Sequence, residues 1–358
     1  MHASTSSSTL DHTWAVILAG GIGSRFWPAS TPTRPKQILP LASERPLVAD
    51  TVERIRPLIP LERLRVLTGD AMVAPIRSAV PELQPDHFLV EPRARGTAPV
   101  LVWAAHALAA RDPDAIMISL HADHVIRPEP AFRALVASAA EAARSHDRLF
   151  TVGIRPTRPE TGYGYIRLGA ALDDAGAYAV HRFVEKPDQE TAQAYLEAGE
   201  YLWNSGIFVW RAGRLLEEVA AHTPELSRLL PLLDRGDVHG YFDAALSLSI
   251  DHGVLERSRR IGVMEATFEW DDVGTWDAAG RTRPGDARGN VVEGEAALRE
   301  ADRCVVWNET GEPVVVFGAK DLVVVRREGV TLVLPRDRAA DLKKLLDSLP
   351  DTVRGSAS

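Results

Sequence analysis

Residues 16–41, VILAGGIGSRFWPASTPTRPKQILPL, decide the fold class of this 358-residue chain. The segment opens with an apolar run that is typical of a buried parallel strand. Glycines 20, 21 and 23 follow, and a backbone without side chains can turn tightly and direct consecutive N–H groups at phosphate oxygens. Arg25 and Lys36 add two cations near the same loop. The segment therefore predicts a strand followed by a loop that holds a nucleoside triphosphate.

Two better-known phosphate-binding motifs fit this loop less well. A P-loop requires a lysine directly after its last glycine, and none follows Gly23. A dinucleotide fingerprint requires Gly or Ala three residues after Gly23, where this chain has Phe26. A lone glycine loop could also be an ordinary turn between a strand and a helix. The neighbouring Trp27-Pro28 and Pro35-Lys36-Gln37 favour the phosphate-binding interpretation.

With these residues the segment resembles the signature of the nucleoside-diphosphate-sugar pyrophosphorylases, or sugar-1-phosphate nucleotidylyltransferases. Its FWP and PKQ variants resemble the mannose-1-phosphate guanylyltransferase branch. Further segments resemble the family in the same order along the chain, over roughly residues 14–349: EPRARGTAP at 91–99, HADH at 121–124, PETGYGYI at 159–166, FVEKP at 183–187, WNSGIFVW at 203–210, SIDHGVLE at 249–256 and WDDVGTW at 270–276.

This resemblance implies a nucleotidyltransferase that converts GTP and α-D-mannose 1-phosphate into GDP-mannose and pyrophosphate with the help of Mg²⁺. Two alternatives stay open. A sibling enzyme would act on another sugar 1-phosphate, of the heptose or glucose type. A non-catalytic regulatory paralogue would be expected to have lost the charged site residues, which this chain retains.

The pattern along residues 14–283 alternates between strands and helices. It favours an α/β fold with a Rossmann-like, mostly parallel sheet and helices on both faces, the nucleotide-diphospho-sugar transferase fold. Residues 284–358 change to short β-rich runs and predict a small C-terminal β domain with a terminal helix capped by Asp337. Relatives suggest a short left-handed β-helix there. Residues 1–13, rich in Ser, Thr and His, are expected to form a disordered tail.

Composition limits the partners. The 45% hydrophobic and 25% charged residues are those of an ordinary globular protein, and the net charge of −8 argues against general nucleic-acid binding. Cys304 is the only cysteine, which excludes an intrachain disulfide and favours a cytoplasmic location. The longest apolar stretch, 98–110, is too short to span a bilayer and predicts a buried helix. We expect no membrane partner; a homodimer is compatible with the sequence, which leaves the oligomeric state open.

The resemblance assigns nucleotide binding to the glycine loop, its cations, the 91–99 loop and the acid after the apolar strand 115–120. These residues are Leu18, Ala19, Gly20, Gly21, Gly23, Ser24, Arg25, Lys36, Glu91, Gly96, Thr97 and Asp123. Arg25, Lys36 and Asp123 are the expected catalytic residues. Arg25 would neutralise the triphosphate and the leaving pyrophosphate, and Lys36 would lie near the α-phosphate.

The sugar phosphate and the metal take other residues of the same motifs. The sugar-phosphate-binding residues implied by the resemblance are Tyr163, Gly164, Glu185, Lys186 and Asn204. Asp123 and Asp272 would hold Mg²⁺, a hard cation that prefers carboxylate and phosphate oxygens. A zinc site at His121, Asp123 and His124 is the alternative, but no other His or Cys cluster supports it, so both histidines are interpreted as structural. His121 also departs from the proline that is usual in the family.

Guanine recognition is expected at Glu91, by hydrogen-bond direction. Guanine offers two adjacent donors, N1–H and the 2-amino group, which one carboxylate can accept together. Relatives that transfer uridylyl or thymidylyl groups align a glutamine with Glu91, and an amide suits a base that offers a donor beside acceptors. The backbone of Gly96 would lie against the base. The alternative is a solvated acid at a strand end.

Overall fold

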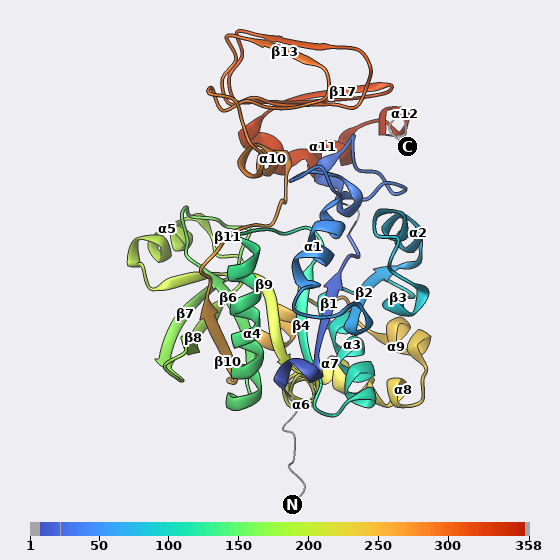
Figure 1. Ribbon diagram of the computed structural model, residues 1–358, viewed down its shortest axis with the longest axis vertical. Coiled ribbons are helices and arrows are strands. Elements are labelled where there is room, and N and C mark those ends of the chain that lie inside the picture. The colour runs from blue at the N-terminus through green and yellow to red at the C-terminus, as the bar shows by residue number, and fades with distance from the viewer. Residues whose placement is uncertain (1–7, 22, 355–358) are drawn as a thin grey trace, which may run out of the picture.

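The structure, a computed structural model, describes residues 8–21 and 23–354. A large α/β part is followed by a smaller β-rich part, and α10 (Trp276–Thr282) and α11 (Leu342–Ser348) lie between them (Figure 1). The α/β class predicted from the sequence is confirmed. Among the described residues, no helix combines the length and the apolar character that crossing a membrane requires.

A nine-stranded sheet forms the centre of the large part, in the order β3-β2-β1-β4-β9-β6-β10-β8-β7. Its strands are β1 (Thr13–Leu18), β2 (Leu64–Gly69), β3 (Phe88–Glu91), β4 (Ile116–His121), β6 (Leu149–Ile154), β7 (Tyr165–Ala171), β8 (Ala177–Val184), β9 (Tyr201–Arg211) and β10 (Ile261–Glu265). The first four strands in this order, β3 to β4, are parallel neighbours. Their carboxyl ends therefore meet at one edge of the sheet.

The prediction of a mostly parallel sheet is wrong for the second half. There, β9 runs antiparallel to both β4 and β6, and β7 pairs with β8 as an antiparallel hairpin. The short connection 172–176 allows only a hairpin, because a parallel crossover needs a dozen or more residues. Of the pairings in this half, β6 with β10 is the parallel one.

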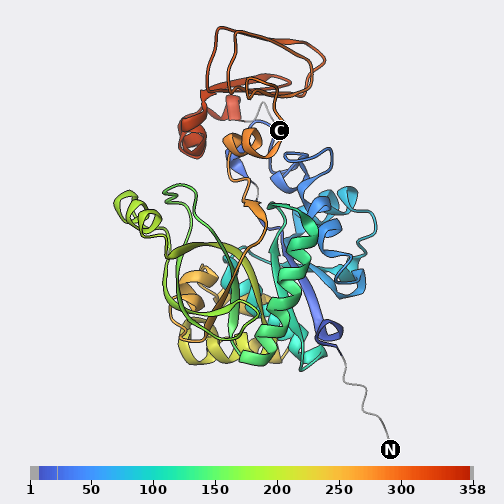
Figure 2. The ribbon, with the colours of Figure 1, turned by 60° about the vertical axis from the view of Figure 1, so that its left-hand side comes forward.

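Helices cover both faces of the sheet, as predicted. On one face lie α1 (Leu47–Ile55), α2 (Asp70–Ala79) and α4 (Glu129–His146), with α4 in front of the strands in Figures 1 and 2. On the other lie α3 (Thr97–Arg111), α6 (Ala212–His222) and α9 (Val238–Ala244). The remaining helices of this part are α5 (Gln189–Ala198), α7 (Pro224–Ser227) and α8 (Leu230–Asp234).

Periodicity explains these faces. In α1 the fully buried Val48, Val52 and Ile55 recur at steps of four and three, which places them on the side that meets the sheet. In α3 apolar residues occur all round, and α6 packs against its outer side. The predicted buried helix at 98–110 is thereby confirmed.

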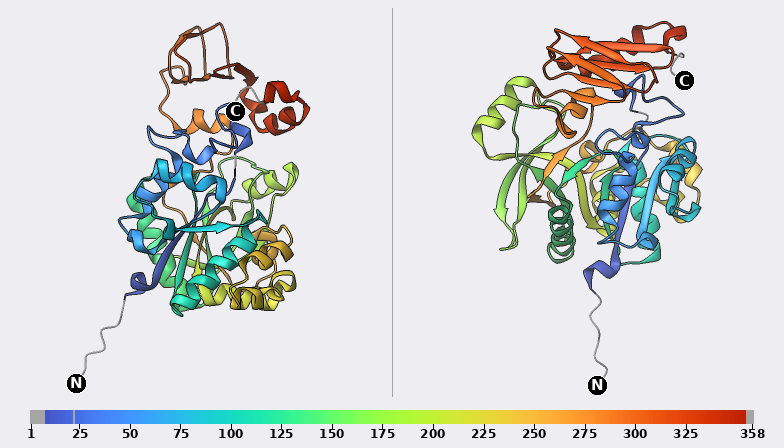
Figure 3. Two further views of the ribbon diagram at one scale, coloured as in Figure 1. Left: turned by 90° about the vertical axis from the view of Figure 1, so that its right-hand side faces the viewer. Right: turned by 45° about the horizontal axis from the view of Figure 1, so that its top comes forward.

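The C-terminal part consists of stacked parallel strands (Figure 3). One row contains β12 (Val291–Glu293), β14 (Val305–Asn308) and β16 (Leu322–Arg327), closed by the antiparallel β17 (Val330–Pro335). A second row contains β13 (Ala296–Arg299) and β15 (Val314–Phe317). Successive parallel rungs are the arrangement of a β-helix. The domain boundary at 283/284 and the handedness stay predictions.

Two predictions near the termini need correction. Asp337 does not cap the terminal helix: it lies inside a 3-10 helix, Arg336–Asp341, that precedes α11, and Pro335 occupies the cap position. The predicted tail 1–13 is too long. Its residues 1–7 lie outside the described residues, but Thr9–His12 form a 3-10 helix, and His12 Nδ1 lies 2.8 Å from Asp112 Oδ2.

An apolar cluster joins the two parts of the chain. The aromatic residues of the signature segment, Phe26 and Trp27, are buried together with Trp276 of α10. Trp307 of β14 and Leu342 of α11 belong to the same cluster. Phe26 and Trp276 meet edge to face, with ring centroids 5.1 Å apart. Apolar burial thus holds the C-terminal part against the segment that follows the glycine loop.

Candidate active site

The glycine loop lies at the carboxyl edge of the parallel strands. Gly23 has φ +77°, and a Cβ added there would lie 2.3 Å from the Cβ of Lys36. Any side chain at this position would combine backbone strain with a clash. Gln37 Nε2 donates to the carbonyl oxygen of Gly21 at 2.6 Å. The loop is therefore closed over the PKQ residues, which keep Lys36 beside it.

Lys36 connects three segments that are distant in sequence. Its buried Nζ lies 2.7 Å from Asp123 Oδ2 and donates to the carbonyl oxygen of Val273 at 2.8 Å. Burial alone would raise the pKa of Asp123, but Lys36, His124 and His121 together hold that pKa at about 2. Asp123 is therefore an ionised carboxylate at neutral pH.

The second predicted metal ligand is brought beside the first by a two-stranded sheet. Strand β5 (Val125–Arg127) pairs with β11 (Glu269–Asp271), so Asp272 follows one strand and Asp123 precedes the other. Tyr163 donates its hydroxyl hydrogen to Asp272 Oδ1 at 2.8 Å. Burial and the neighbouring Asp271 raise the pKa of Asp272.

Both carboxylates line one cavity of about 400 Å³, here called the central cavity. Two acids whose charges are partly buried and face one space are the donor set that suits a divalent cation. The structure therefore brings together the predicted pair Asp123 and Asp272.

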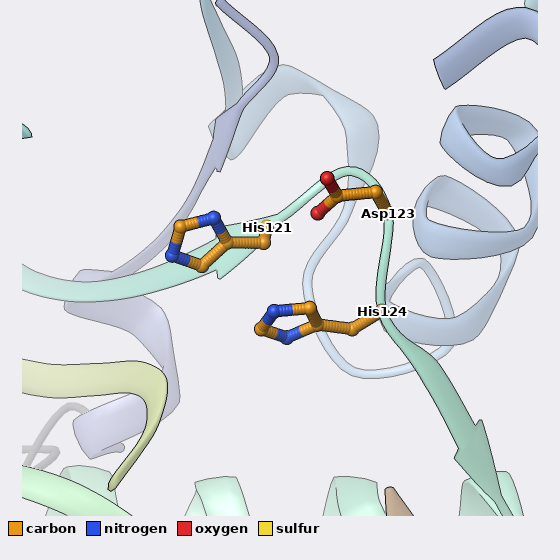
Figure 4. A group of neighbouring side chains, drawn as sticks. All are labelled: His121, Asp123 and His124. Atoms are coloured by element: carbon orange, nitrogen blue, oxygen red, sulfur yellow. The ribbon is translucent and has the colours of Figure 1, made fainter. Parts of the chain in front are cut away.

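The turn after β4 also gathers the two histidines (Figure 4). One ligand atom from each of His121, Asp123 and His124 lies within 4.8 Å of the others. The imidazole rings stack with centroids 4.7 Å apart, and His124 Nδ1 accepts a hydrogen bond from Trp270 Nε1 at 3.1 Å. Burial lowers the pKa of both histidines, so both are neutral at pH 7. This hydrogen bond helps to hold Trp270, two residues before Asp272, in place.

A second cavity, the glycine-loop cavity, shares residues with the first and has a volume of about 360 Å³. Nine of the predicted nucleotide-binding residues line it: Leu18, Gly20, Gly21, Gly23, Lys36, Glu91, Gly96, Thr97 and Asp123. Ser24 and Arg25 line the central cavity instead. Ala19 does not line either cavity, because it is buried where its N–H and C=O bond to Leu67 and Thr68 of β2.

The predicted base loop packs against residues 248–250. Gly96 has φ +83°, and a Cβ there would lie 2.6 Å from the carbonyl oxygen of Leu248. Thr97 Oγ1 accepts from the backbone N–H of Ile250 at 2.9 Å. Glu91 Oε1 would lie 3.1 Å from a Cβ on Gly20, so its carboxylate faces the glycine loop. Burial raises its pKa, and within residues 8–21 and 23–354 no donor reaches that carboxylate.

The predicted sugar residues form a third group. A Cβ on Gly164 would lie 2.6 Å from Glu185 Oε2, and the Gly164 carbonyl accepts from the N–H of Asn204 at 2.8 Å. Tyr163 and the exposed Lys186 line a wide outer cleft, which shares Arg25 and Asp272 with the central cavity. Lys186 has φ +46° and is ion-paired with Glu185.

Sequence reasoning missed Asp251 as a member of this group. Asn204 Nδ2 donates to Asp251 Oδ1 at 2.9 Å, while Asn204 Oδ1 accepts from Thr151 at 2.8 Å. Burial and the charge of Glu185 raise the pKa of Asp251 to about 6. The signal that could have found it is the SID run at 249–251, which belongs to a segment that resembles the family.

Residues 14–285 match the sequence model of the Nucleotidyl transferase family. The chain is 36% identical over 352 residues to a mannose-1-phosphate guanylyltransferase of Klebsiella pneumoniae, covering 95% of this chain and 74% of that protein. It belongs to the nucleotidyl transferase family. A mannose-1-phosphate guanylyltransferase of Escherichia coli K12 is 37% identical over 353 residues, covering 94% of this chain and 73% of that protein.

A solved structure of the same family has a similar fold over almost the whole chain. This crystal structure from Thermus thermophilus, described as a mannose-1-phosphate geranyltransferase, superimposes with a TM-score of 0.86 at 34% identity. It covers 94% of this chain and 98% of its own, so the C-terminal part belongs to the shared fold. The predicted membership of the mannose-1-phosphate guanylyltransferase branch is confirmed, and this family generally uses a divalent metal ion.

Proposed function

We propose that this chain transfers the GMP group of GTP to α-D-mannose 1-phosphate and releases pyrophosphate. The observation that carries the proposal is the buried Lys36, which links the glycine loop to Asp123 while Asp272 faces the same cavity. The named activity of the family's relatives supports GTP and mannose 1-phosphate as substrates.

The reaction is an in-line displacement at phosphorus. A phosphate oxygen of the sugar forms a bond to the α-phosphorus of GTP, and the bond from that phosphorus to the bridging oxygen of pyrophosphate breaks. The nucleophile is already an anion, so no general base is needed. Repulsion between anions and the charge of the transition state are the obstacles, and positioning with electrostatic stabilisation has to overcome them.

The site residues divide this work. Backbone N–H groups of the glycine loop and the cation of Arg25 hold the triphosphate, and Lys36 lies at the α-phosphate. Lys186 pairs with the sugar phosphate when its bond to Glu185 opens. Asp123 and Asp272 fit Mg²⁺, which supplies positive charge against the phosphate oxygens when it is bound.

The metal itself is tested by replacement. Protein stripped with a chelator is expected to regain pyrophosphate release with Mg²⁺. Restoration by Zn²⁺ with no response to Mg²⁺ would instead favour the group His121, Asp123 and His124 as the site.

Substrate identity is tested by measuring pyrophosphate release from GTP with a panel of sugar 1-phosphates. Mannose 1-phosphate is expected to give the highest kcat/KM, above glucose 1-phosphate and heptose 1-phosphates. A higher value with one of the others would establish the sibling activity. No release with any sugar, from folded protein supplied with metal, would support the regulatory paralogue.

The first residue-level prediction concerns guanine. Glu91→Gln should weaken the use of GTP by about 1–3 kcal/mol, because an amide cannot accept both donors of the guanine edge. Use of UTP should fall far less or rise. The measurement is the ratio of kcat/KM for GTP and UTP. Glu82→Gln, which changes an exposed acid that lines none of these cavities, is the control, and an unchanged ratio in Glu91→Gln would place guanine recognition elsewhere.

The second prediction concerns the sugar phosphate. Lys186→Ala should raise KM for mannose 1-phosphate roughly tenfold to a hundredfold with little effect on KM for GTP, because one charge-assisted phosphate contact is lost. Lys320→Ala is the matched control, since Lys320 is an exposed lysine of the same cleft that lies 3.8 Å from Asp302. If Lys186→Ala changed only the GTP dependence, the assignment would be wrong.

A further inference from the structure

One wall of the central cavity comes from the far end of the chain. Besides residues of the signature loop and both predicted metal ligands, Lys343 of α11 lines this cavity. Helix α11 packs against the 3-10 helix Ser24–Phe26, which contains Arg25. Segments more than 300 positions apart in the sequence therefore lie side by side, and Figures 1 and 3 show α11 next to the segment that follows β1.

Buried neighbours hold Lys343 in this place. The preceding Leu342 is 1% exposed and belongs to the apolar cluster that contains Phe26 and Trp27. Arg336, at the start of the same segment, donates from Nε to Asp277 Oδ1 of α10 at 2.7 Å. These contacts fix the backbone of Lys343 at the cavity while its side chain stays exposed.

The cations that line the central cavity differ in whether their side chains already have partners. Lys36 is committed to Asp123 and to the Val273 carbonyl. Within residues 8–21 and 23–354, neither Arg25 nor Lys343 has an ion pair or hydrogen bond from its side chain. These two cations are therefore free to bind an anion, and a triphosphate or pyrophosphate carries several charges that need cations.

Lysine is scarce in this chain, which sharpens the comparison between Lys343 and its neighbour. Five of the 41 basic residues are lysines, and four of them, Lys36, Lys186, Lys320 and Lys343, line the central cavity or the outer cleft. Lys344 lines none of these cavities and lies 3.4 Å from Asp341 of its own segment. Lys344 is an ordinary surface lysine, and Lys343 is not.

We propose that Lys343 binds the β- and γ-phosphates of the triphosphate, and hence the leaving pyrophosphate, beside Arg25. The C-terminal part then contributes directly to the active site in addition to packing behind the loop. This inference rests on the proposed function, because it places a triphosphate in the central cavity.

The test compares Lys343→Ala with Lys344→Ala in both directions of the reaction. For Lys343→Ala, KM for GTP and for pyrophosphate should each rise roughly tenfold, the low end for a charged contact at an exposed side chain. KM for mannose 1-phosphate and for GDP-mannose should change less than about twofold, because neither carries the leaving pyrophosphate. Lys343→Arg should restore part of the loss, and Lys344→Ala should match the wild type.

Several outcomes would overturn the proposal. They are unchanged KM values in Lys343→Ala, equal losses for pyrophosphate and GDP-mannose, and an equal effect of Lys344→Ala. If the wild type itself releases no pyrophosphate from GTP and mannose 1-phosphate, the proposed function fails. Calorimetric titration with inorganic pyrophosphate and Mg²⁺ then decides this inference separately, since Lys343→Ala must bind roughly tenfold more weakly than the wild type for it to stand.

Discussion

Asp123→Asn and Asp272→Asn are each expected to lower kcat about a thousandfold, a loss of about 4 kcal/mol of transition-state stabilisation. Each substitution removes one charged oxygen ligand from the cavity that both acids line. The double variant should be little slower than either single variant, because ligands of one metal act as a unit. Steady-state pyrophosphate release measures all three.

The two variants should differ in stability, which separates the metal from the fold. Asp123→Asn leaves the buried Lys36 without its carboxylate and should lower the melting temperature. Asp272→Asn should leave the melting temperature unchanged or raise it, because burial and Asp271 disfavour the charge of Asp272, and an amide oxygen still accepts from Tyr163.

Asp271→Asn is the matched control for both variants. It removes the adjacent charge, which lies 2.9 Å from Arg281, but keeps an oxygen that accepts from the N–H of Val273. Its turnover should stay within about tenfold of the wild type. Turnover near the wild-type value in Asp123→Asn or Asp272→Asn would exclude this metal site.

The second large effect is expected from Lys36→Met, which keeps an unbranched side chain, one atom shorter, and removes its charge. Turnover should fall at least a hundredfold, because the buried cation that we propose at the α-phosphate is lost, and neither methionine nor water carries the charge that stabilises the transition state. The pKa of Asp123 should rise, because burial raises it and Lys36 is the main group that holds it at about 2. Kinetics and an NMR titration of the carboxyl group measure the two effects.

A double-mutant cycle checks the origin of this effect. Lys36→Met and Asp123→Asn should be strongly non-additive in both kcat and stability, since their charged atoms lie 2.7 Å apart. Lys320→Met, an exposed lysine of the outer cleft, is the control for removing a positive charge. A Lys36→Met variant that retained most of its turnover would show that the α-phosphate lies elsewhere.

Local sequence determined most of the elements and the chemistry of the glycine loop. The apolar run at 115–120 predicts β4 and the spacing of α1 predicts its buried face, because both patterns depend on neighbouring residues alone. Gly23 is likewise a local signal, since its φ of +77° suits glycine. The order of motifs along the chain was enough to identify the family, and the match to the family model and to the relatives confirms it.

The tertiary structure alone decided which of these residues meet. The antiparallel course of β9, between β4 and β6, depends on how the chain returns from β8 through α5, and local periodicity holds no information on that path. The same is true of Asp251 at Asn204, of Ala19 outside the cavities, and of Lys343 beside Arg25. From the local sequence alone, the exposed Lys343 after the buried Leu342 indicates only a helix face in contact with water. Only the burial of Leu342 in one apolar cluster with Phe26 and Trp27, which long-range packing sets, turns that face toward the central cavity.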